Sequence, residues 1–343
     1  TKIETAAIMM DPNTGEVLAL IGGNNYSKSQ FNRATKAKRQ VGSTMKPLLY
    51  YSALESGFTS SSSFTSEKTT FTFSGGKSYS PKNYNDRYAE GPLSMEAAIA
   101  YSDNIYAVKT HLFLGESNLI NTAKRLGITS NLSEVPSLAL GTSEISLIEM
   151  TSAYSCFASL GYKTTPHFIK KIEDSKGNIL YENKEEKELL LNPSLTYILN
   201  EMLTSTYNKN FINYNYPTLI SLLPQITHKY AIKSGTTDTD LLIMGYNKNV
   251  VLGVWNGYDN NPKIDSSEYS HHKNIWIDTM ESYFKQKEAS WYEIPNNVVG
   301  VLTEPITGAL ATDETQNKEM FFYLKGTEPS AESNYKDLEA VFQ

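Results

Sequence analysis

The sequence predicts an α+β fold in which helices cover a central antiparallel β-sheet. Residues 4–10 and 16–21 are apolar, strand-like runs, and the breaker residues between them predict a tight turn and a hairpin. Several helical patterns lie between this hairpin and residue 229. Three further strand-like runs follow, at residues 229–233, 241–246 and 250–255. We expect the hairpin and the three late strands to form one sheet.

The first helix is expected to begin at Ser43. Pro47 falls in its first turn, where proline is tolerated, and apolar residues continue to Gly57, which would end the helix. Residues 58–88 are rich in Ser, Thr, Asn and Gly and are interpreted as a surface excursion with a short strand at 69–73. Further helices are expected at residues 94–100, 105–114, 118–126, 147–160 and 194–203, and a second hairpin at 167–173 and 178–182.

The chain is long for a single domain. We expect a main domain at residues 1–290 and a C-terminal extension at 291–343, in which apolar runs at 298–302 and 321–324 suggest a small β appendage. The net charge of −6 argues against a nucleic-acid partner. The sequence begins at Thr1 without a leader or an apolar run that could cross a bilayer, so we expect a fragment whose anchor lies upstream.

Cysteine and histidine do not predict a metal site. Cys156 is the only cysteine, and its apolar helical surroundings place it in the core. The adjacent His271 and His272 lie in a polar segment and are interpreted as solvated, so no metal is assigned. The basic run at residues 33–39 is likewise interpreted as a solvated loop.

Three short motifs carry the candidate chemistry: Ser-x-x-Lys at residues 43–46, Ser-x-Asn at 102–104 and Lys-Ser-Gly at 233–235. A serine and a lysine three residues apart share one face of a helix, so Lys46 is expected within hydrogen-bond reach of the Ser43 hydroxyl. A neutral lysine there could take the proton of the serine and activate it as a nucleophile.

The chain offers two more Ser-x-x-Lys matches, at residues 74–77 and 270–273. The first lies in a Gly-rich turn and the second in a polar loop, and neither is judged to lead into a helix. Only the match at Ser43 is followed by helical apolar periodicity, so it is taken as the nucleophile motif.

The three motifs in this order resemble the serine β-lactamase and penicillin-binding protein superfamily. The likeness to the transpeptidase domain of class A penicillin-binding proteins covers nearly the whole chain, including Phe-Asn-Arg-Ala at 31–34, Pro-Lys-Asn-Tyr at 81–84 and Gly-Val-Trp-Asn-Gly-Tyr-Asp at 253–259. It departs at residues 240–243, where Asp-Leu-Leu-Ile replaces an aromatic Asp-x-Trp segment usual in the family.

The resemblance implies a sheet flanked by helices with a second helical lobe and the active site between them. It also implies a peptidoglycan D,D-transpeptidase that forms a Ser43 acyl-enzyme from stem peptides ending in D-Ala-D-Ala and is inhibited by β-lactams. Lys46 would be the base, Ser102 the proton relay and Asn104 a positioning group. Burial or a second cation, which Lys233 could supply, would have to disfavour charged Lys46.

The remaining implied roles concern substrate binding. The backbone N–H groups of Ser43 and Thr236 would form the oxyanion hole. Neither a cofactor nor a metal is implied. The terminal carboxylate of the substrate would be received by Lys233, Ser234 and Thr236, within a binding segment that also includes Gly235 and Thr237.

Alternative functions remain open at this point. A serine β-lactamase would need a glutamate that holds a deacylating water, and Glu144 and Glu134 are candidates. A D,D-carboxypeptidase or a non-catalytic sensor of penicillin or wall peptide would also fit the motifs. The resemblance further implies an upstream membrane helix and glycosyltransferase domain, a place on the extracytoplasmic face of a bacterial membrane, and partners among cell-wall synthesis or division proteins.

Overall fold

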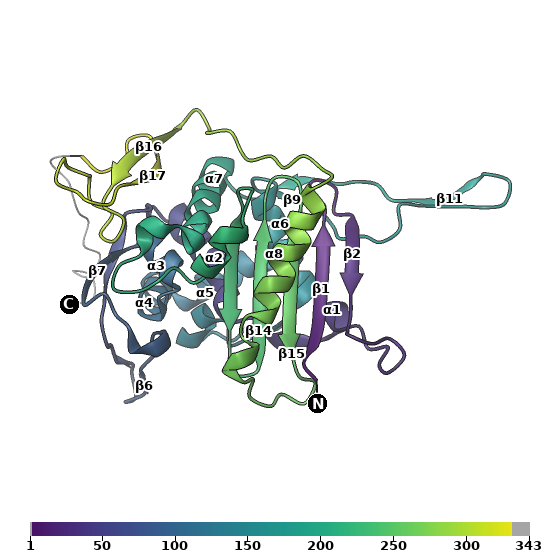
Figure 1. Ribbon diagram of the computed structural model, residues 1–343, viewed down its shortest axis with the longest axis horizontal. Coiled ribbons are helices and arrows are strands. Elements are labelled where there is room, and N and C mark those ends of the chain that lie inside the picture. The colour runs from purple at the N-terminus through teal and green to yellow at the C-terminus, as the bar shows by residue number, and fades with distance from the viewer. Residues whose placement is uncertain (1, 331–343) are drawn as a thin grey trace.

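The computed structural model describes residues 2–330 and has a five-stranded antiparallel sheet at its centre (Figure 1). The register pairs the N-terminal strand with a strand late in the sequence, since Glu4 pairs with Gly257 and Met10 with Val251. The predicted union of the N-terminal hairpin with the late strands is therefore confirmed. The strand order is β13 (Ala231–Thr236), β14 (Asp240–Tyr246), β15 (Val251–Gly257), β1 (Glu4–Met10) and β2 (Val17–Ile21).

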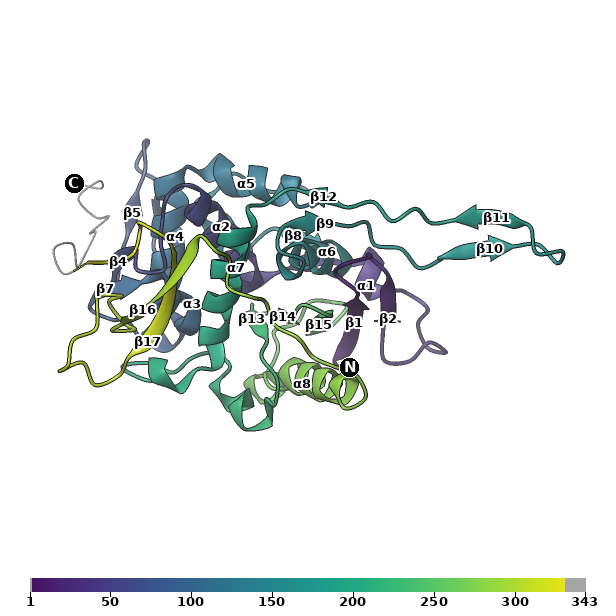
Figure 2. The same cartoon turned by 90° about the horizontal axis from the view of Figure 1, so that it is seen from above.

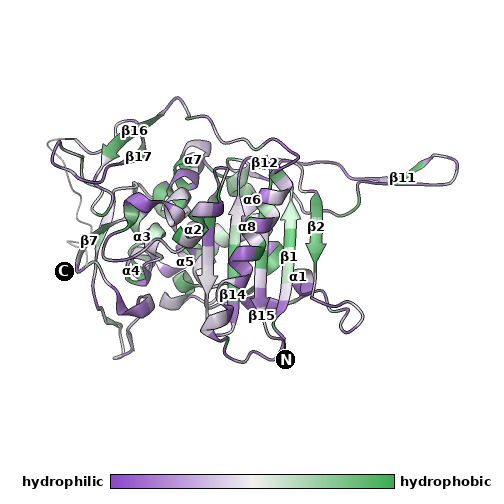
Figure 3. Ribbon diagram, viewed as in Figure 1, coloured by the Kyte–Doolittle hydropathy of each residue, from purple (hydrophilic) through white to green (hydrophobic). Residues whose placement is uncertain are grey.

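Helices cover both faces of this sheet, with α6 (Leu147–Ala158) on one side and α8 (His271–Phe284) on the other (Figure 2). Both approach closely because glycines face them. A Cβ on Gly253 would lie 2.6 Å from Thr151 Oγ1 of α6, and one on Gly245 would lie 2.3 Å from the Trp276 ring of α8. Hydrophobic residues run along the strands between the two helices (Figure 3).

A helical lobe packs beside the sheet around α2 (Lys46–Glu55). Residues 46–54 of α2 are all buried, as expected for a helix that has neighbours on every side. Its neighbours are α4 (Asn104–Leu114), α5 (Glu116–Arg125) and α7 (Pro193–Met202), while α3 (Met95–Tyr101) packs against α4 and the 3-10 helix η4 (Leu203–Tyr207).

Short elements connect these layers. The two-stranded sheets are β3 (Lys38–Gln40) with β8 (Glu144–Ser146), β4 (Ser63–Ser66) with β7 (Gly91–Ser94), β5 (Phe71–Thr72) with β6 (Ser78–Tyr79), and β9 (Tyr162–Lys163) with β12 (Glu188–Leu189). The short helices are α1 (Arg33–Lys36), η1 (Gly42–Met45), η2 (Tyr84–Asp86), η3 (Pro136–Leu140), η5 (Lys209–Phe211), η6 (Ile220–Gln225) and η7 (Ser266–Glu268).

Two further hairpins lie at opposite ends of the molecule. β10 (Lys171–Glu173) and β11 (Ile179–Glu182) form an arm that projects from the body (Figures 1 and 2). β16 (Val298–Thr303) and β17 (Glu319–Leu324) pair within the proposed C-terminal extension, and β17 packs on α7. Residues 331–343 of that extension lie outside the described residues.

Some sequence interpretations were wrong. The segment at 270–273 is not a loop but the start of α8, and His272 is fully buried. Arg33 is not solvated either, because its guanidinium is buried and forms an ion pair with Asp259. Cys156 is buried in the core, as predicted. Within residues 2–330, no helix combines the length and apolarity needed to span a membrane.

Candidate active site

Ser43 lies in η1, a 3-10 turn that leads directly into α2. The helix was predicted to begin at Ser43, and its first residues form this tighter turn before the α-helix starts at Lys46. Glycines allow close approach here. Gly42 has φ +56°, and a Cβ on it would lie 3.2 Å from the backbone nitrogen of Thr236. A Cβ on Gly141 would overlap the carbonyl oxygen of Gly42 at 2.0 Å. The Ser43 turn therefore packs closely between strand β13 and the end of η3.

Lys46 is fully buried at the start of α2. Its Nζ donates to the Ser102 carbonyl oxygen at 2.8 Å and to Asn104 Oδ1 at 2.7 Å, and it lies 3.1 Å from Ser102 Oγ. Burial lowers the pKa of Lys46 to about 7, although Asp103 partly opposes the shift. A substantial neutral fraction is therefore present near neutral pH.

Ser102 lies in the break between α3 and α4 with left-handed backbone angles, φ 54° and ψ 46°. Such a conformation is costly for a residue with a side chain and is retained where the surrounding structure fixes it. Asp103 begins α4 by accepting a hydrogen bond from the Tyr106 N–H at 2.8 Å. Asn104 is held from both sides, because its N–H donates to Asn83 Oδ1 and its Nδ2 to the Lys82 carbonyl, each at 2.7 Å.

Lys233 approaches Ser102 from the sheet. It lies in the middle of β13, not at a strand end as predicted, and is 1% exposed. Its Nζ donates to Ser102 Oγ at 3.0 Å and to the Ser234 carbonyl at 2.7 Å. Burial, followed by repulsion from Lys46, lowers the pKa of Lys233. The Ser102 hydroxyl thus sits between two buried lysine amines.

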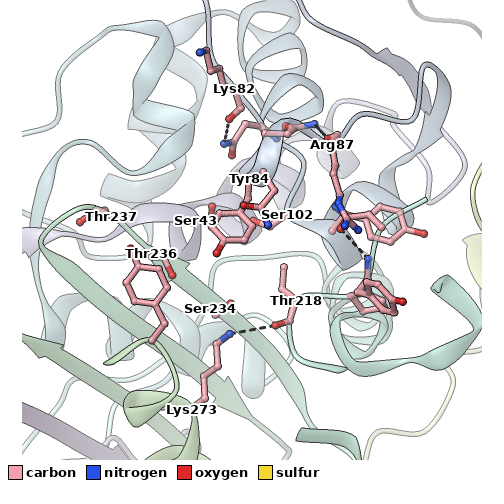
Figure 4. A pocket seen from close by; sticks show the side chains of 18 of the residues that line it. Ser43, Lys82, Tyr84, Arg87, Ser102, Thr218, Ser234, Thr236, Thr237 and Lys273 are labelled. Carbon is pink, nitrogen blue, oxygen red and sulfur yellow. Dashed lines mark hydrogen bonds between the residues drawn. The ribbon is translucent and has the colours of Figure 1, made fainter. Parts of the chain in front are cut away.

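A cleft of about 700 Å³ opens over these residues (Figure 4). The predicted residues that line it are Ser43, Ser102, Asn104, Ser234, Thr236 and Thr237. Lys46 and Lys233 lie beneath its wall. Gly235 does not line the cleft. A Cβ there would meet the Val41 carbonyl oxygen at 2.5 Å, so Gly235 lets β13 approach the turn that carries Ser43.

The alternative deacylating carboxylates do not reach the cleft. Glu144 and Glu134 are exposed and do not line it. Among the described residues that do, Asp238 is the only acid, and its side chain is 81% exposed. In the described part of the chain, no three His, Cys, Asp or Glu side chains gather as a metal site would need.

The structure adds lining residues that the motifs did not identify. Tyr84 and Arg87 come from the surface excursion, Thr218 from the segment before β13, and Tyr269 and Lys273 from the start of α8. Lys273 belongs to the Ser-x-x-Lys match that was set aside. A sequence signal for that helix exists, since Trp276, Ile277, Met280 and Phe284 follow at helical spacing.

Comparison with known proteins identifies the family. The family model described as the penicillin binding protein transpeptidase domain matches residues 5–265. The chain belongs to this family. Penicillin-binding protein 2D of Bacillus subtilis is 44% identical over 330 residues, which cover 96% of this chain and 48% of the relative. Penicillin-binding protein 1A of Aquifex aeolicus is 36% identical over 336 residues, which cover 95% of this chain and 44% of the relative.

A solved structure of the same family supports the fold. Penicillin-binding protein 1A of Haemophilus influenzae superposes with a TM-score of 0.85 at 26% identity, covering 96% of this chain and 54% of that one. The transpeptidase domain described here spans about half the length of the curated relatives it matches.

Proposed function

We propose that this penicillin-binding protein transpeptidase domain crosslinks peptidoglycan stem peptides through a Ser43 acyl-enzyme formed from D-Ala-D-Ala donors. The observation that carries the proposal is the Ser102 hydroxyl held 3.1 Å from Lys46 Nζ and 3.0 Å from Lys233 Nζ, at the cleft that Ser43 lines. This arrangement supports the proposed roles of Ser43 as nucleophile, Lys46 as base and Ser102 as proton relay.

Acylation begins when Ser43 Oγ attacks the penultimate carbonyl carbon of the donor. Neutral Lys46 takes the hydroxyl proton, which the lowered pKa of about 7 permits at neutral pH. The carbonyl oxygen becomes an oxyanion and accepts hydrogen bonds from the N–H groups of Ser43 and Thr236. Losing one such donor typically costs about 3 kcal/mol of barrier.

Collapse of the tetrahedral intermediate breaks the bond between the carbonyl carbon and the nitrogen of the terminal D-Ala. Ser102 donates its proton to that nitrogen and regains one from protonated Lys46, so D-Ala leaves as an amine and Lys46 returns to neutral. The ester on Ser43 is then attacked by an amine of a second stem peptide, which loses a proton through the same relay and releases Ser43.

The substrate groups find partners along the cleft. Ser234, Thr236 and Thr237 line it and would donate hydrogen bonds to the terminal carboxylate, while Lys233 beneath them contributes positive charge. Asn104 would hold the substrate amide as well as Lys46. The proposal needs neither cofactor nor metal. β-Lactams would acylate Ser43 as substrate mimics.

The setting of the reaction is also a proposal. The domain would act on the extracytoplasmic face of the bacterial membrane, anchored by a segment upstream of this chain, and work with cell-wall synthesis or division proteins. A β-lactamase is disfavoured because Glu144 and Glu134 do not line the cleft. A carboxypeptidase would use the same acyl-enzyme with water as acceptor.

The test is intact-mass measurement after incubation with benzylpenicillin. One adduct should form, digestion should place it on Ser43, and Ser43→Ala should abolish it. An adduct on Ser74 or Ser270 would overturn the assignment. The adduct should persist for many minutes to hours and be insensitive to Glu144→Ala. Turnover within seconds that Glu144→Ala removes would instead show a β-lactamase.

Amine transfer separates the remaining alternatives. A small thioester donor should be turned over, and D-amino acids should capture the acyl group as an amide. Hydrolysis alone, with no amide product at high amine concentration, would indicate a carboxypeptidase. Labelling without any turnover of the thioester would indicate a sensor.

A further inference from the structure

Two lysines line the active-site cleft, the exposed Lys82 and the more buried Lys273. Lys273 lies in the first turn of α8, and its Nζ points across the cleft to the Thr218 carbonyl oxygen, 3.4 Å away (Figure 4). No carboxylate in residues 2–330 forms an ion pair with it. The nearby Glu268 carboxylate pairs with His271 at 2.6 Å instead. Lys273 is thus a cation with one long hydrogen bond and unused donors.

The surroundings of Lys273 favour an anion. Burial lowers its pKa, and no acid offsets that shift. The first turn of α8 carries no acidic residue, and a cation at a helix N-terminus is unfavourable. A bound carboxylate would relieve both costs.

Thr218 offers a second unsatisfied group at the same end of the cleft. Its Oγ1 is buried and has no hydrogen-bond partner among the described residues. Its N–H donates to the Ala100 carbonyl of α3 at 2.9 Å, which fixes the segment. Thr218 and Lys273 both line this end of the cleft, and the buried Thr218 hydroxyl and the Lys273 ammonium each retain capacity for an acceptor.

The two lysines beneath the cleft wall already donate hydrogen bonds to protein groups. Lys46 donates to Ser102 and Asn104, and Lys233 donates to Ser102 and to the Ser234 carbonyl. Both serve the proton relay beneath the wall of the cleft. Lys273 is the largely buried lysine that lines the cleft and keeps donors free for a ligand.

We propose that Lys273, beside Thr218, binds a carboxylate of the donor peptide and is a specificity-determining residue. The inference rests on the proposed function, because the donor is the substrate of that reaction. The carboxylate is either that of the leaving C-terminal residue, shared with Ser234, Thr236 and Thr237 of the same cleft, or that of another acidic position in the peptide. Both would form the same charge-assisted hydrogen bond to the ammonium.

The experiment compares paired thioester donors in the intact domain. One donor carries a carboxylate on the leaving group, the second a carboxamide there, and a third a carboxamide there plus a carboxylate in the acyl part. Lys273→Met keeps the aliphatic stem and removes the charge. The Lys273→Met variant should lower kcat/KM about 10- to 100-fold for a donor whose carboxylate contacts Lys273. For the second donor, which carries neither carboxylate, kcat/KM should fall less than about threefold.

Control variants separate recognition from charge alone. Lys273→Arg keeps a cation and should recover most of the rate. Lys285→Gln removes the same charge from an exposed position at the other end of α8 and should change no rate. The melting temperature of Lys273→Met should equal or exceed that of the parent, because an unpaired, largely buried charge is removed.

The donor that loses rate identifies the source of the carboxylate, and either source supports the proposal. An equal loss with all three donors would show that Lys273 acts on Lys233 and would overturn it, as would no loss with any donor. Benzylpenicillin labelling of Ser43 in the parent protein keeps the two proposals distinguishable. Labelling with no donor selectivity removes only the Lys273 subsite, whereas no labelling removes the proposed function itself.

Discussion

Lys46 and Lys233 are buried beside one hydroxyl with little negative charge to balance them. Asp103 partly offsets the effect of burial on Lys46, whereas burial and repulsion both lower the pKa of Lys233. An unpaired buried ammonium is expensive unless it gives up its proton. The burial that disfavours charged Lys46 is therefore also what would let Lys46 act as the proposed base at neutral pH.

Replacing Lys46 by arginine tests this base. Arg keeps the charge but does not release a proton in proteins. Lys46→Arg should therefore acylate with benzylpenicillin at least about 100-fold more slowly, the lower range for loss of general-base catalysis. Stopped-flow or quenched labelling measures the rate, and circular dichroism checks the fold. A near-parental rate in a folded variant would show that another group accepts the Ser43 proton.

The pH dependence of acylation follows from the same lysine. Only deprotonated Lys46 can accept the Ser43 proton, so the second-order rate constant should rise with pH and level off above about 7. Lys46→Arg should lose this rise. A parental profile flat between pH 5.5 and 8.5 would contradict the assignment of Lys46 as the titrating base.

The sequence predicted candidate residues that the structure brings close to one cleft, but not how they are connected. Spacing suggested a contact from Lys46 to Ser43, whereas no hydrogen bond joins these two side chains in residues 2–330, and Lys46 binds Ser102. Lys46 and Ser102 are 56 positions apart in the sequence, and local periodicity does not predict contacts at such a separation. The Arg33–Asp259 pair spans 226 positions and was missed for the same reason.

At the scale of elements, α6 begins with a complete capping box. Ser146 accepts from the Glu149 N–H, and the Glu149 carboxylate accepts from the Ser146 N–H. The same carboxylate accepts from the Thr129 N–H at 2.8 Å and from Ser130 Oγ at 2.6 Å. Burial alone would raise the pKa of Glu149, but hydrogen bonds from Ser130 and Ser146 outweigh it and lower the pKa to about 2.

Glu149→Ala should lower the free energy of unfolding at pH 7 by about 1 to 3 kcal/mol, since it removes the cap and leaves several donors unpaired. A lowered pKa stabilises the fold above the ordinary value of 4.5, and this contribution is lost as pH falls toward 2. The difference between the two proteins should therefore shrink over that range.

Urea unfolding monitored by circular dichroism measures the Glu149 effect. Glu144→Ala provides the matched control, because this exposed glutamate lies five residues earlier in β8 and should change the free energy of unfolding by less than about 0.5 kcal/mol. A Glu149 effect no larger than that of Glu144 would contradict a structural role for the carboxylate.

Periodicity predicted the existence of most elements better than their limits. The helices α3 to α7 and the five strands of the main sheet were expected. β13 nevertheless runs three residues past Lys233, because Thr236 pairs with Leu241. Pairing with β14 sets the C-terminal end of β13. Gly235 in the motif has a low strand preference, so local sequence preference did not predict this end.

At the scale of the whole molecule, the cleft forms where the sheet meets the helical lobe. Ser43 comes from η1 just before α2, Ser102 from the α3–α4 break, Ser234 from β13 and Lys273 from α8. The sequence predicted the sheet and the motif residues, and the family resemblance implied the lobe. The far wall at Thr218 and Lys273 depends on packing between distant segments, which no local pattern specifies.

The β10–β11 arm is a peripheral part of this molecule. Its two strands pack on each other, and large apolar side chains on it are exposed, including Ile172 at 44% and Leu180 at 67%. An isolated two-stranded hairpin is marginal in water, and segments with few buried contacts open at low free-energy cost. The arm therefore contributes little to the stability of the body.

Shortening the arm tests this independence. At the base of the arm, the Asn183 N–H donates to the Lys170 carbonyl oxygen at 2.8 Å. The same hydrogen bond would close a two-residue hairpin loop, so residues 171–182 can be replaced by Asn-Gly. The shortened protein should keep its free energy of unfolding within about 0.5 kcal/mol and its rate of Ser43 acylation within twofold. The parent should be cut first in the arm by limited proteolysis, with the nicked protein still labelled by benzylpenicillin. A large loss of stability or acylation on shortening would mean that the arm supports the body or the cleft, in conflict with the way it projects from the body (Figure 2).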